Sequence, residues 1–324
     1  MKTLHSHTLR RVGAWRLAMP AVALLGGLCS CVHEMPAEPQ VPAGQGVHVL
    51  LQWEREPQVV PEGMSVLFYP EGGGGPQRYE MGILGGEAYY LKGGTYSAVT
   101  FNNDTHALLF MGSGEFGTLS VSTRMAALSS PLTLYSGPEL PRAAEEEVSL
   151  CQPDMLWGAS LEPTTVAQGD TVRLYPRQLV ARYSVEAEGI ENMASVSQVS
   201  MALSGLATGW NFATASPLPE RATVPGSLSR KSHTELRGQM LTFGLPSPQG
   251  RDRNILTLYF LLLDGSKRAY EFDVTDQILS APDPLEVHIR VSGISLPEVD
   301  TGSSGPGMDV DVDQWEIVEI ELST

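Results

Sequence analysis

The sequence predicts an all-β protein made of two tandem β-sandwiches behind a lipoprotein signal peptide. Three observations predict this class: apolar and polar residues alternate from Val47 onwards, helical periodicity is almost absent, and Gly (33) and Pro (23) are plentiful among 324 residues. Many short alternating strands separated by turn residues are typical of antiparallel sandwiches. The pattern supports helical turns only at residues 143–147 and 275–279.

Residues 1–30 read as a signal peptide rather than as part of the fold. Four basic side chains precede an apolar run over residues 17–28, which is too short to span a bilayer. Leu28 and Ser30 then stand at positions −3 and −1 before Cys31, as in a bacterial lipoprotein signal. We expect cleavage between Ser30 and Cys31 and acylation of Cys31, which would hold the protein at a membrane. An ordinary secretory signal cut near Ser30 is the alternative.

Residues 31–46, with the acylated Cys31 and several Pro, are expected to form a flexible tether, and the body behind it divides into two domains. The predicted N-terminal sandwich covers residues 47–162 and the predicted C-terminal sandwich covers residues 163–324. Their strands follow the alternating apolar pattern. The expected strands are 47–53, 64–68, 88–91, 96–101, 106–111, 118–123 and 155–161, then 172–175, 179–187, 196–203, 239–244, 255–263, 269–274, 285–291 and 310–322.

Composition excludes several function classes. The chain has 37 acidic and 21 basic side chains, a formal charge of −16, which argues against nucleic acid as a partner. Three Cys cannot form a disulfide-dense scaffold, and once Cys31 is acylated and Cys29 removed, Cys151 remains as an expected buried structural residue. No nucleophile elbow, Walker sequence or metal-ligand spacing occurs, so we predict no catalytic residues, no enzyme activity, no cofactor and no metal.

Three patterns that resemble functional motifs have simpler interpretations. Residues 112–117 match G-x-G-x-x-G, but no helix follows, so a β-turn is expected. Asp309, Asp311 and Asp313 share one face of a predicted strand, where a solvated face is favoured over a cation site because Gln314 replaces the Gly of a calcium loop. Thr171, within Asp170-Thr171-Val172, resembles a bacterial O-glycosylation acceptor, a match that also arises by chance.

Several stretches together resemble one family. They are residues 47–53, 63–70, 91–105, 203–207, 272–275 and 310–315. The set resembles Bacteroidales lipoproteins of the fimbrillin superfamily, and within it FimB/Mfa-type anchoring subunits. The resemblance implies two transthyretin-like (Greek-key) sandwiches, lipid attachment at the outer membrane, and fimbrial-type protein subunits as partners. In that family, sheet edges accept or donate strands. The face of the outer membrane that carries the protein stays open.

The implied partner-docking surface is a sheet edge. One candidate is the last strand, with Val318, Ile320 and Leu322 on its apolar face, and the other is the apolar strand 255–263. Ordinary sandwich core is the simpler interpretation of both.

Two other functions remain as alternatives. One is glycan or host-ligand binding on the same scaffold, which would need an exposed aromatic platform. Among the tryptophans, Trp53 and Trp157 are expected in the core, Trp210 is the one expected to be exposed, and Trp315 is left open. The other alternative is a surface hydrolase, which would need two carboxylates in a cleft.

Overall fold

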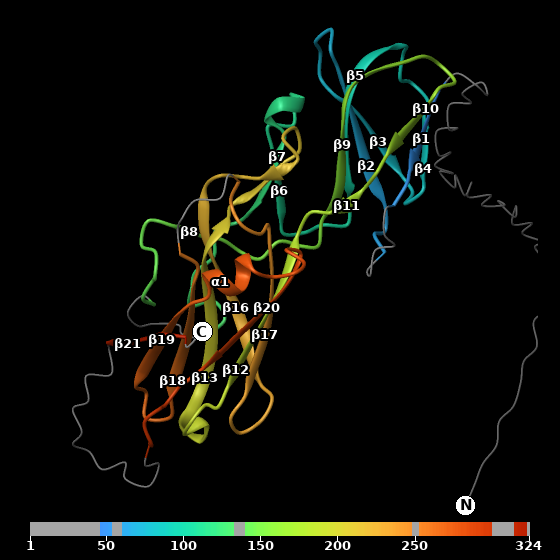
Figure 1. Cartoon of the computed structure of the whole chain (residues 1–324). Helices are drawn as coiled ribbons and strands as arrows, with labels where there is room; N and C mark the ends of the chain where they lie inside the picture. Colours follow the sequence, from blue (N-terminus) through green and yellow to red (C-terminus); the bar gives the residue numbers. More distant parts are fainter. Residues whose placement is uncertain (1–45, 54–59, 133–139, 248–252, 300–313, 323–324) are drawn as a thin grey trace, which may run out of the picture. The chain divides into compact units, whose positions relative to one another are not determined.

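The structure is a computed structural model that describes residues 46–53, 60–132, 140–247, 253–299 and 314–322. The all-β class predicted from the sequence is confirmed (Figure 1). The described ranges contain one α-helix, α1 (Thr275–Leu279), at the predicted place, and two 3-10 turns, η1 (Phe116–Thr118) and η2 (Met193–Ser195). Every described residue belongs to one compact unit, Pro42–Thr324.

The strands follow the predicted order with several additions, but the predicted strand 88–91 is wrong, because the strand there ends at Ala88 and residues 89–90 form a turn. In the first part of the chain they are β1 (Val47–Leu51), β2 (Met64–Pro70), β3 (Gln77–Met81), β4 (Gly85–Ala88), β5 (Gly94–Asn102), β6 (Leu108–Met111), β7 (Ser120–Thr123), β8 (Val148–Ser149), β9 (Trp157–Val166), β10 (Thr171–Leu174) and β11 (Arg177–Gln178). In the second part they are β12 (Ala181–Glu188), β13 (Val196–Ala207), β14 (Gly209–Asn211), β15 (Ser216–Pro217), β16 (Arg221–Arg230), β17 (Leu236–Thr242), β18 (Ile255–Leu262), β19 (Lys267–Asp273), β20 (Glu286–Ser292) and β21 (Trp315–Ile320).

The first sandwich packs a three-stranded sheet, in the order β10-β1-β4, against a five-stranded sheet, in the order β11-β9-β5-β2-β3. Alternate residues of β1 show why this happens: Val47, Val49 and Leu51 all lie on one side of the strand and are buried. They meet Val66 and Phe68 of β2 in one apolar cluster. The first core is therefore formed by the alternation read from the sequence.

The predicted division at residue 162 falls within β9, which pairs with β5 as far as Val166. Beyond it, β10 pairs in parallel with β1, with Thr171 opposite His48. Strands after residue 162 thus belong to the first group of sheets. The exact division of the chain stays a prediction.

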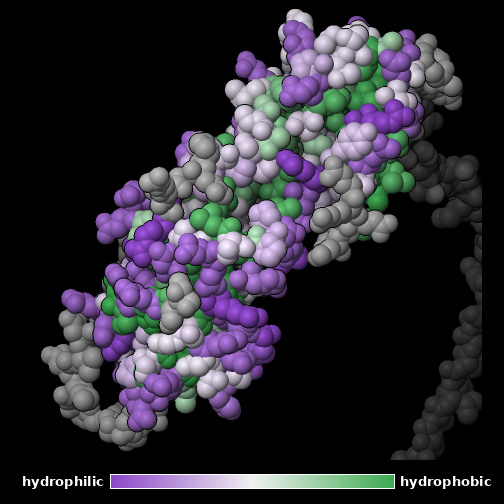
Figure 2. All heavy atoms as spheres, in the orientation of Figure 1, coloured by the Kyte–Doolittle hydropathy of each residue, from purple (hydrophilic) through white to green (hydrophobic). Residues whose placement is uncertain are grey.

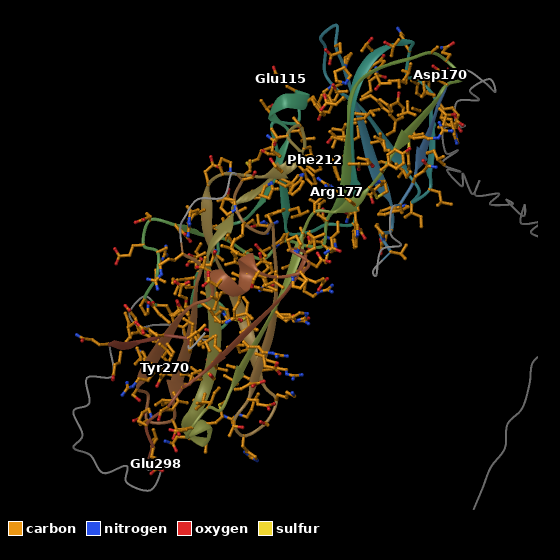
Figure 3. The ribbon with its side chains drawn as sticks, in the orientation of Figure 1. Glu115, Asp170, Arg177, Phe212, Tyr270 and Glu298 are labelled. Carbon is orange, nitrogen blue, oxygen red and sulfur yellow. The ribbon has the colours of Figure 1, made fainter. Side chains whose placement is uncertain are left out.

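A four-stranded sheet, in the order β15-β14-β7-β6, combines strands from both parts of the chain. Trp210 of β14 pairs with Val121 of β7. Beneath this sheet, Phe212, labelled in Figure 3, contacts Phe101 of the five-stranded sheet with 5.6 Å between ring centroids. The two parts of the chain therefore share a second apolar cluster.

The remaining strands form a nine-stranded sheet in the order β20-β12-β17-β16-β13-β18-β19-β21, with β8 beside β16. The long strand β16 joins its two halves, because Arg221–Ser227 of β16 pairs with β13 and Leu228–Arg230 pairs with β17. Side chains from both halves, such as Val185 and Phe260, meet in the largest apolar cluster. Hydrophilic residues cover most of the visible face of the molecule (Figure 2).

Candidate partner-docking edge

Strand β21 forms one end of the nine-stranded sheet (Figure 1). It runs parallel to β19, with Lys267 opposite Trp315 and Phe272 opposite Ile320. Within the described ranges, no strand pairs with the outer edge of β21. An edge strand presents backbone donors and acceptors that a further strand can pair with.

The apolar face of β21 is only partly buried. Val318, Ile320 and Leu322 pack against the large cluster inside the sheet as half-buried side chains. On the other face, the ring of Trp315 meets Tyr259 edge to face at 5.5 Å, while half of Ile317 is exposed. The predicted residues thus lie at a sheet edge and also contact the core, and their role in partner docking stays a prediction.

The electrostatics of the β19–β21 pair are mixed. Arg268 forms an ion pair with Glu316 at 3.1 Å. Glu271, however, lies directly opposite Glu319, which is a like-charge pair. Burial raises the pKa of the Glu271 carboxyl, the charge of Glu319 raises it further, and Arg253 lowers it. Such opposed like charges destabilise strand pairing.

A segment before β8, described here by its residues up to 132 and from 140, covers the face of the sheet on which Trp315 lies. Leu128, Leu132 and Leu140 from this segment pack on Tyr259 of β18, together with Trp315. The hydroxyl of Tyr259 donates a hydrogen bond of 2.7 Å to the Pro141 carbonyl. The segment therefore buries polar and small residues that would otherwise form an open sheet face.

Glu147 fixes this segment at a β-bulge in β13. Its carboxylate is buried and accepts hydrogen bonds from the Gly205 amide at 3.1 and 3.0 Å, from Thr223 Oγ1 at 2.9 Å and from Arg221 Nε at 2.8 Å. Gly205 adopts φ +78° at the point where the register between β13 and β16 shifts. An L side chain is strained at this φ, and its Cβ would lie 3.0 Å from the Arg253 carbonyl oxygen, so the bulge favours Gly. Sequence reasoning noted Gly205 only as part of the family resemblance and missed its contact with Glu147.

Several sequence predictions are wrong. Strand 255–263 is no edge, since β18 lies between β13 and β19. Trp210 is buried, with 9% of its surface exposed and the guanidinium of Arg177 5.8 Å from its ring centre. Cys151 is half-buried rather than buried. Residues 143–147, expected as one short helical turn, form bends around a turn closed by a hydrogen bond from the Glu147 amide to the Ala144 carbonyl.

Other predictions agree with the structure or concern residues outside the described ranges. Residues 112–117 form the turn between β6 and β7, as expected, and Thr171 is exposed. Trp157 is buried and Trp53 half-buried, both as core residues. The cleavage site Ser30 and Cys31 lie outside the described residues. So do the three carboxylates at Asp309, Asp311 and Asp313.

The described ranges contain no group of three His, Cys, Asp or Glu side chains arranged to hold a metal ion. In the same ranges, no helix is long and apolar enough to cross a membrane.

The chain is similar to a curated protein over part of its length. Over 159 residues it is 28% identical to a Bacteroides ovatus protein provisionally named fimbrium anchoring subunit Fim4B, and the match covers 47% of this chain and 43% of that protein. The chain thus spans less than half the length of this curated relative. The resemblance to Bacteroidales fimbrial anchoring subunits predicted from the sequence is confirmed.

Two solved structures share the fold. One is a Bacteroides ovatus protein described as a candidate adhesin, with a TM-score of 0.61 and 19% identity over 79% of this chain and 94% of that one. The other is a Bacteroides thetaiotaomicron protein described as a candidate polysaccharide-binding protein (DUF1812), with a TM-score of 0.50 and 8% identity over 77% and 91%.

Residues 30–225 match the model of the family DUF5119, a domain of unknown function. That match covers more than half of the chain. The protein therefore belongs to the DUF5119 family.

Proposed function

We propose that this protein is an outer-membrane lipoprotein that anchors or assists a fimbria-like surface assembly. The relative named as a fimbrium anchoring subunit supports this role, and the neighbour described as an adhesin supports the fold it requires. The predicted signal peptide, residues 1–30, is followed by Cys31, whose acylation would supply the attachment to lipid. The proposal concerns the whole protein, although the curated relative is matched over only part of its length.

The docking part of the proposal rests on the outer edge of β21, with which no other strand of the described residues pairs. A partner subunit can add a strand to such an edge through main-chain hydrogen bonds, and side chains then give specificity. Glu316 and Glu319 are exposed along β21. Charges on an edge strand discourage indiscriminate pairing, so the partner strand is expected to carry Lys or Arg opposite them.

We infer a division of the body into two sandwiches after β11 rather than at residue 162. The support is that β10 pairs with β1 and β11 with β9, whereas β12 begins the nine-stranded sheet. The transthyretin-like character of each sandwich is part of the same proposal.

A non-enzymatic role follows from this proposal. Glu147, a buried carboxylate that lines a cleft, is hydrogen-bonded to Gly205, Thr223 and Arg221, so it serves the fold. The glycan-binding alternative gains no support from tryptophan, because Trp53, Trp157, Trp210 and Trp315 are all buried or half-buried.

The anchor is tested by the Cys31→Ser variant. Wild-type cells fed labelled palmitate should incorporate label into the protein and retain it in the detergent phase of a Triton X-114 separation. Cys31→Ser should lose both. Equal labelling of the two proteins would contradict the anchor, and an unlabelled wild type would favour an ordinary secretory signal.

The docking edge is tested by photo-crosslinking in intact cells. A photoreactive amino acid at Ile317, which is half-exposed on β21, should form an adduct with a pilin-type subunit. The matched control is Leu279, an exposed apolar residue at the end of α1. Equal adducts at both positions, or none at Ile317, would count against docking at β21.

A further inference from the structure

Two exposed tyrosines form a turn at one end of the first sandwich. Tyr89 and Tyr90 follow β4, with 49% and 60% of their surfaces exposed. The turn is anchored, because the Leu91 amide donates to the Ala88 carbonyl at 3.2 Å and the Leu91 side chain is fully buried in the first core. Both rings are therefore presented to the surroundings from a fixed backbone.

The N-terminal segment joins the sandwich beside this turn. A Cβ placed on Gly46 would lie 3.1 Å from the Cα of Tyr89, so the two backbones are in contact. On its other side, the Gly46 carbonyl accepts a hydrogen bond of 2.8 Å from the Gly169 amide. The neighbouring Asp170, labelled in Figure 3, accepts from the His48 amide at 2.8 Å through its carbonyl. Gly46 thus lies between the tyrosine turn and the β9–β10 turn.

We propose that Tyr89 and Tyr90 contact the headgroup region of the membrane in which Cys31 is acylated, an inference that rests on the proposed lipid anchor. Residues 32–45 can span at most about 50 Å when fully extended. The end of the body that holds Gly46 therefore lies within that distance of the acylated Cys31. Tyrosine is enriched at membrane–water interfaces because its ring is apolar and its hydroxyl is polar.

Charges at this end are compatible with contact despite the acidity of the whole chain. Glu87 pairs with His48 at 2.8 Å, and the carboxylate of Asp170 accepts a hydrogen bond from the Ala167 amide at 2.7 Å. Lys92, directly after the turn, is exposed and can approach lipid phosphates. The end thus offers two phenols and an ammonium group to the headgroups, beside the exposed, hydrogen-bonded carboxylates of Glu87 and Asp170.

The test uses the acylated full-length protein in phosphatidylethanolamine–phosphatidylglycerol vesicles that contain spin-labelled lipid. An environment-sensitive fluorophore is attached at Tyr90→Cys in a Cys151→Ser background. The matched control is Leu84→Cys in the same background, because Leu84 is 70% exposed and lies at the opposite end of β4. Flotation of the vesicles reports whether the protein is anchored at all.

The expected result is a blue shift and a loss of emission by lipid quenching at position 90, with neither at position 84. Flotation without quenching at position 90, or with equal quenching at both positions, overturns the tyrosine contact and leaves the anchor intact. A blue shift without lipid quenching indicates a protein neighbour, such as a second copy, and also overturns it. Loss of flotation overturns the Cys31 anchor and, with it, this inference.

Discussion

Strands β18 and β21 look alike as apolar stretches, yet the fold uses them differently. β18 pairs on both sides and has six of its eight residues buried, whereas β21 pairs on one side and has no buried residue. The sequence of β18, ILTLYFLL, is almost continuously apolar, while that of β21, WEIVEI, is interrupted by glutamates. Apolarity on both faces thus marks a central strand, and apolarity on one face is compatible with an edge.

The largest expected effect is at the centre of the sheet. Phe260→Ala removes a fully buried ring that meets Tyr270 edge to face at 5.6 Å. Truncating a buried Phe typically lowers the free energy of unfolding by about 3–5 kcal/mol. Urea denaturation followed by circular dichroism measures this change. Ile317→Ala on β21 is the control and should shift the midpoint far less; similar shifts would refute the contrast between the two strands.

The next largest effect concerns the bulge in β13, the neighbour of β18. Glu147→Ala leaves the Gly205 amide, the Thr223 hydroxyl and the Arg221 guanidinium without this carboxylate. Losing one partner of a buried, charged hydrogen-bond network costs about 3–5 kcal/mol. The same denaturation experiment measures it, with the exposed neighbour Glu146→Ala as control. If both variants unfold alike, Glu147 does not hold the segment over the sheet.

The contrast between the two strands also shows what the sequence could and could not predict. Alternation found β1, β5 and β21 because each strand carries its own period-two signal. It could not place β18 in the sheet, because strand order depends on partners far away in the chain. It missed β16, whose interior Pro225 and Gly226 read as a turn.

The sequence likewise predicted one part of the candidate site and missed another. The apolar face of β21 was visible as Val318, Ile320 and Leu322. The contact between Glu147 and Gly205 was not, because 58 residues separate them and neither has a periodic signal. The burial of Trp210 likewise depends on β7, which pairs with β14 across a long separation in sequence.

A smaller effect is expected from removing the edge strand itself. Deleting residues 314–324 should leave the nine-stranded sheet folded, because Val318 and Ile320 only partly cover its core. Amide hydrogen exchange should quicken in β19, which loses its neighbour, and remain slow in β18. Mass spectrometry of peptides from both strands measures this. Loss of protection throughout β18 would show that β21 is an integral core strand rather than a separable edge.

The smallest effect concerns the like-charge pair between β19 and β21. Glu319→Gln removes the charge opposite Glu271. One cross-strand pair contributes about 0.2–1 kcal/mol to the free energy of strand pairing, so amide hydrogen exchange in β21 should slow accordingly. Burial and Glu319 raise the pKa of Glu271 above its unfolded value. Ionised Glu271 therefore weakens the pairing above that raised pKa, and acidification through it should strengthen the pairing. In Glu319→Gln this pH dependence should shrink.

Glu316→Gln is the matched control, since it changes the same residue type on the same strand with the opposite expected sign. Glu316 pairs with Arg268 at 3.1 Å, so its neutralisation removes an attraction rather than a repulsion. Exchange in β21 should therefore quicken slightly, within the 1 kcal/mol that exposed ion pairs typically contribute. If both substitutions shift exchange in the same direction, the net acidity of the edge governs its pairing, and the opposed glutamates have no specific role.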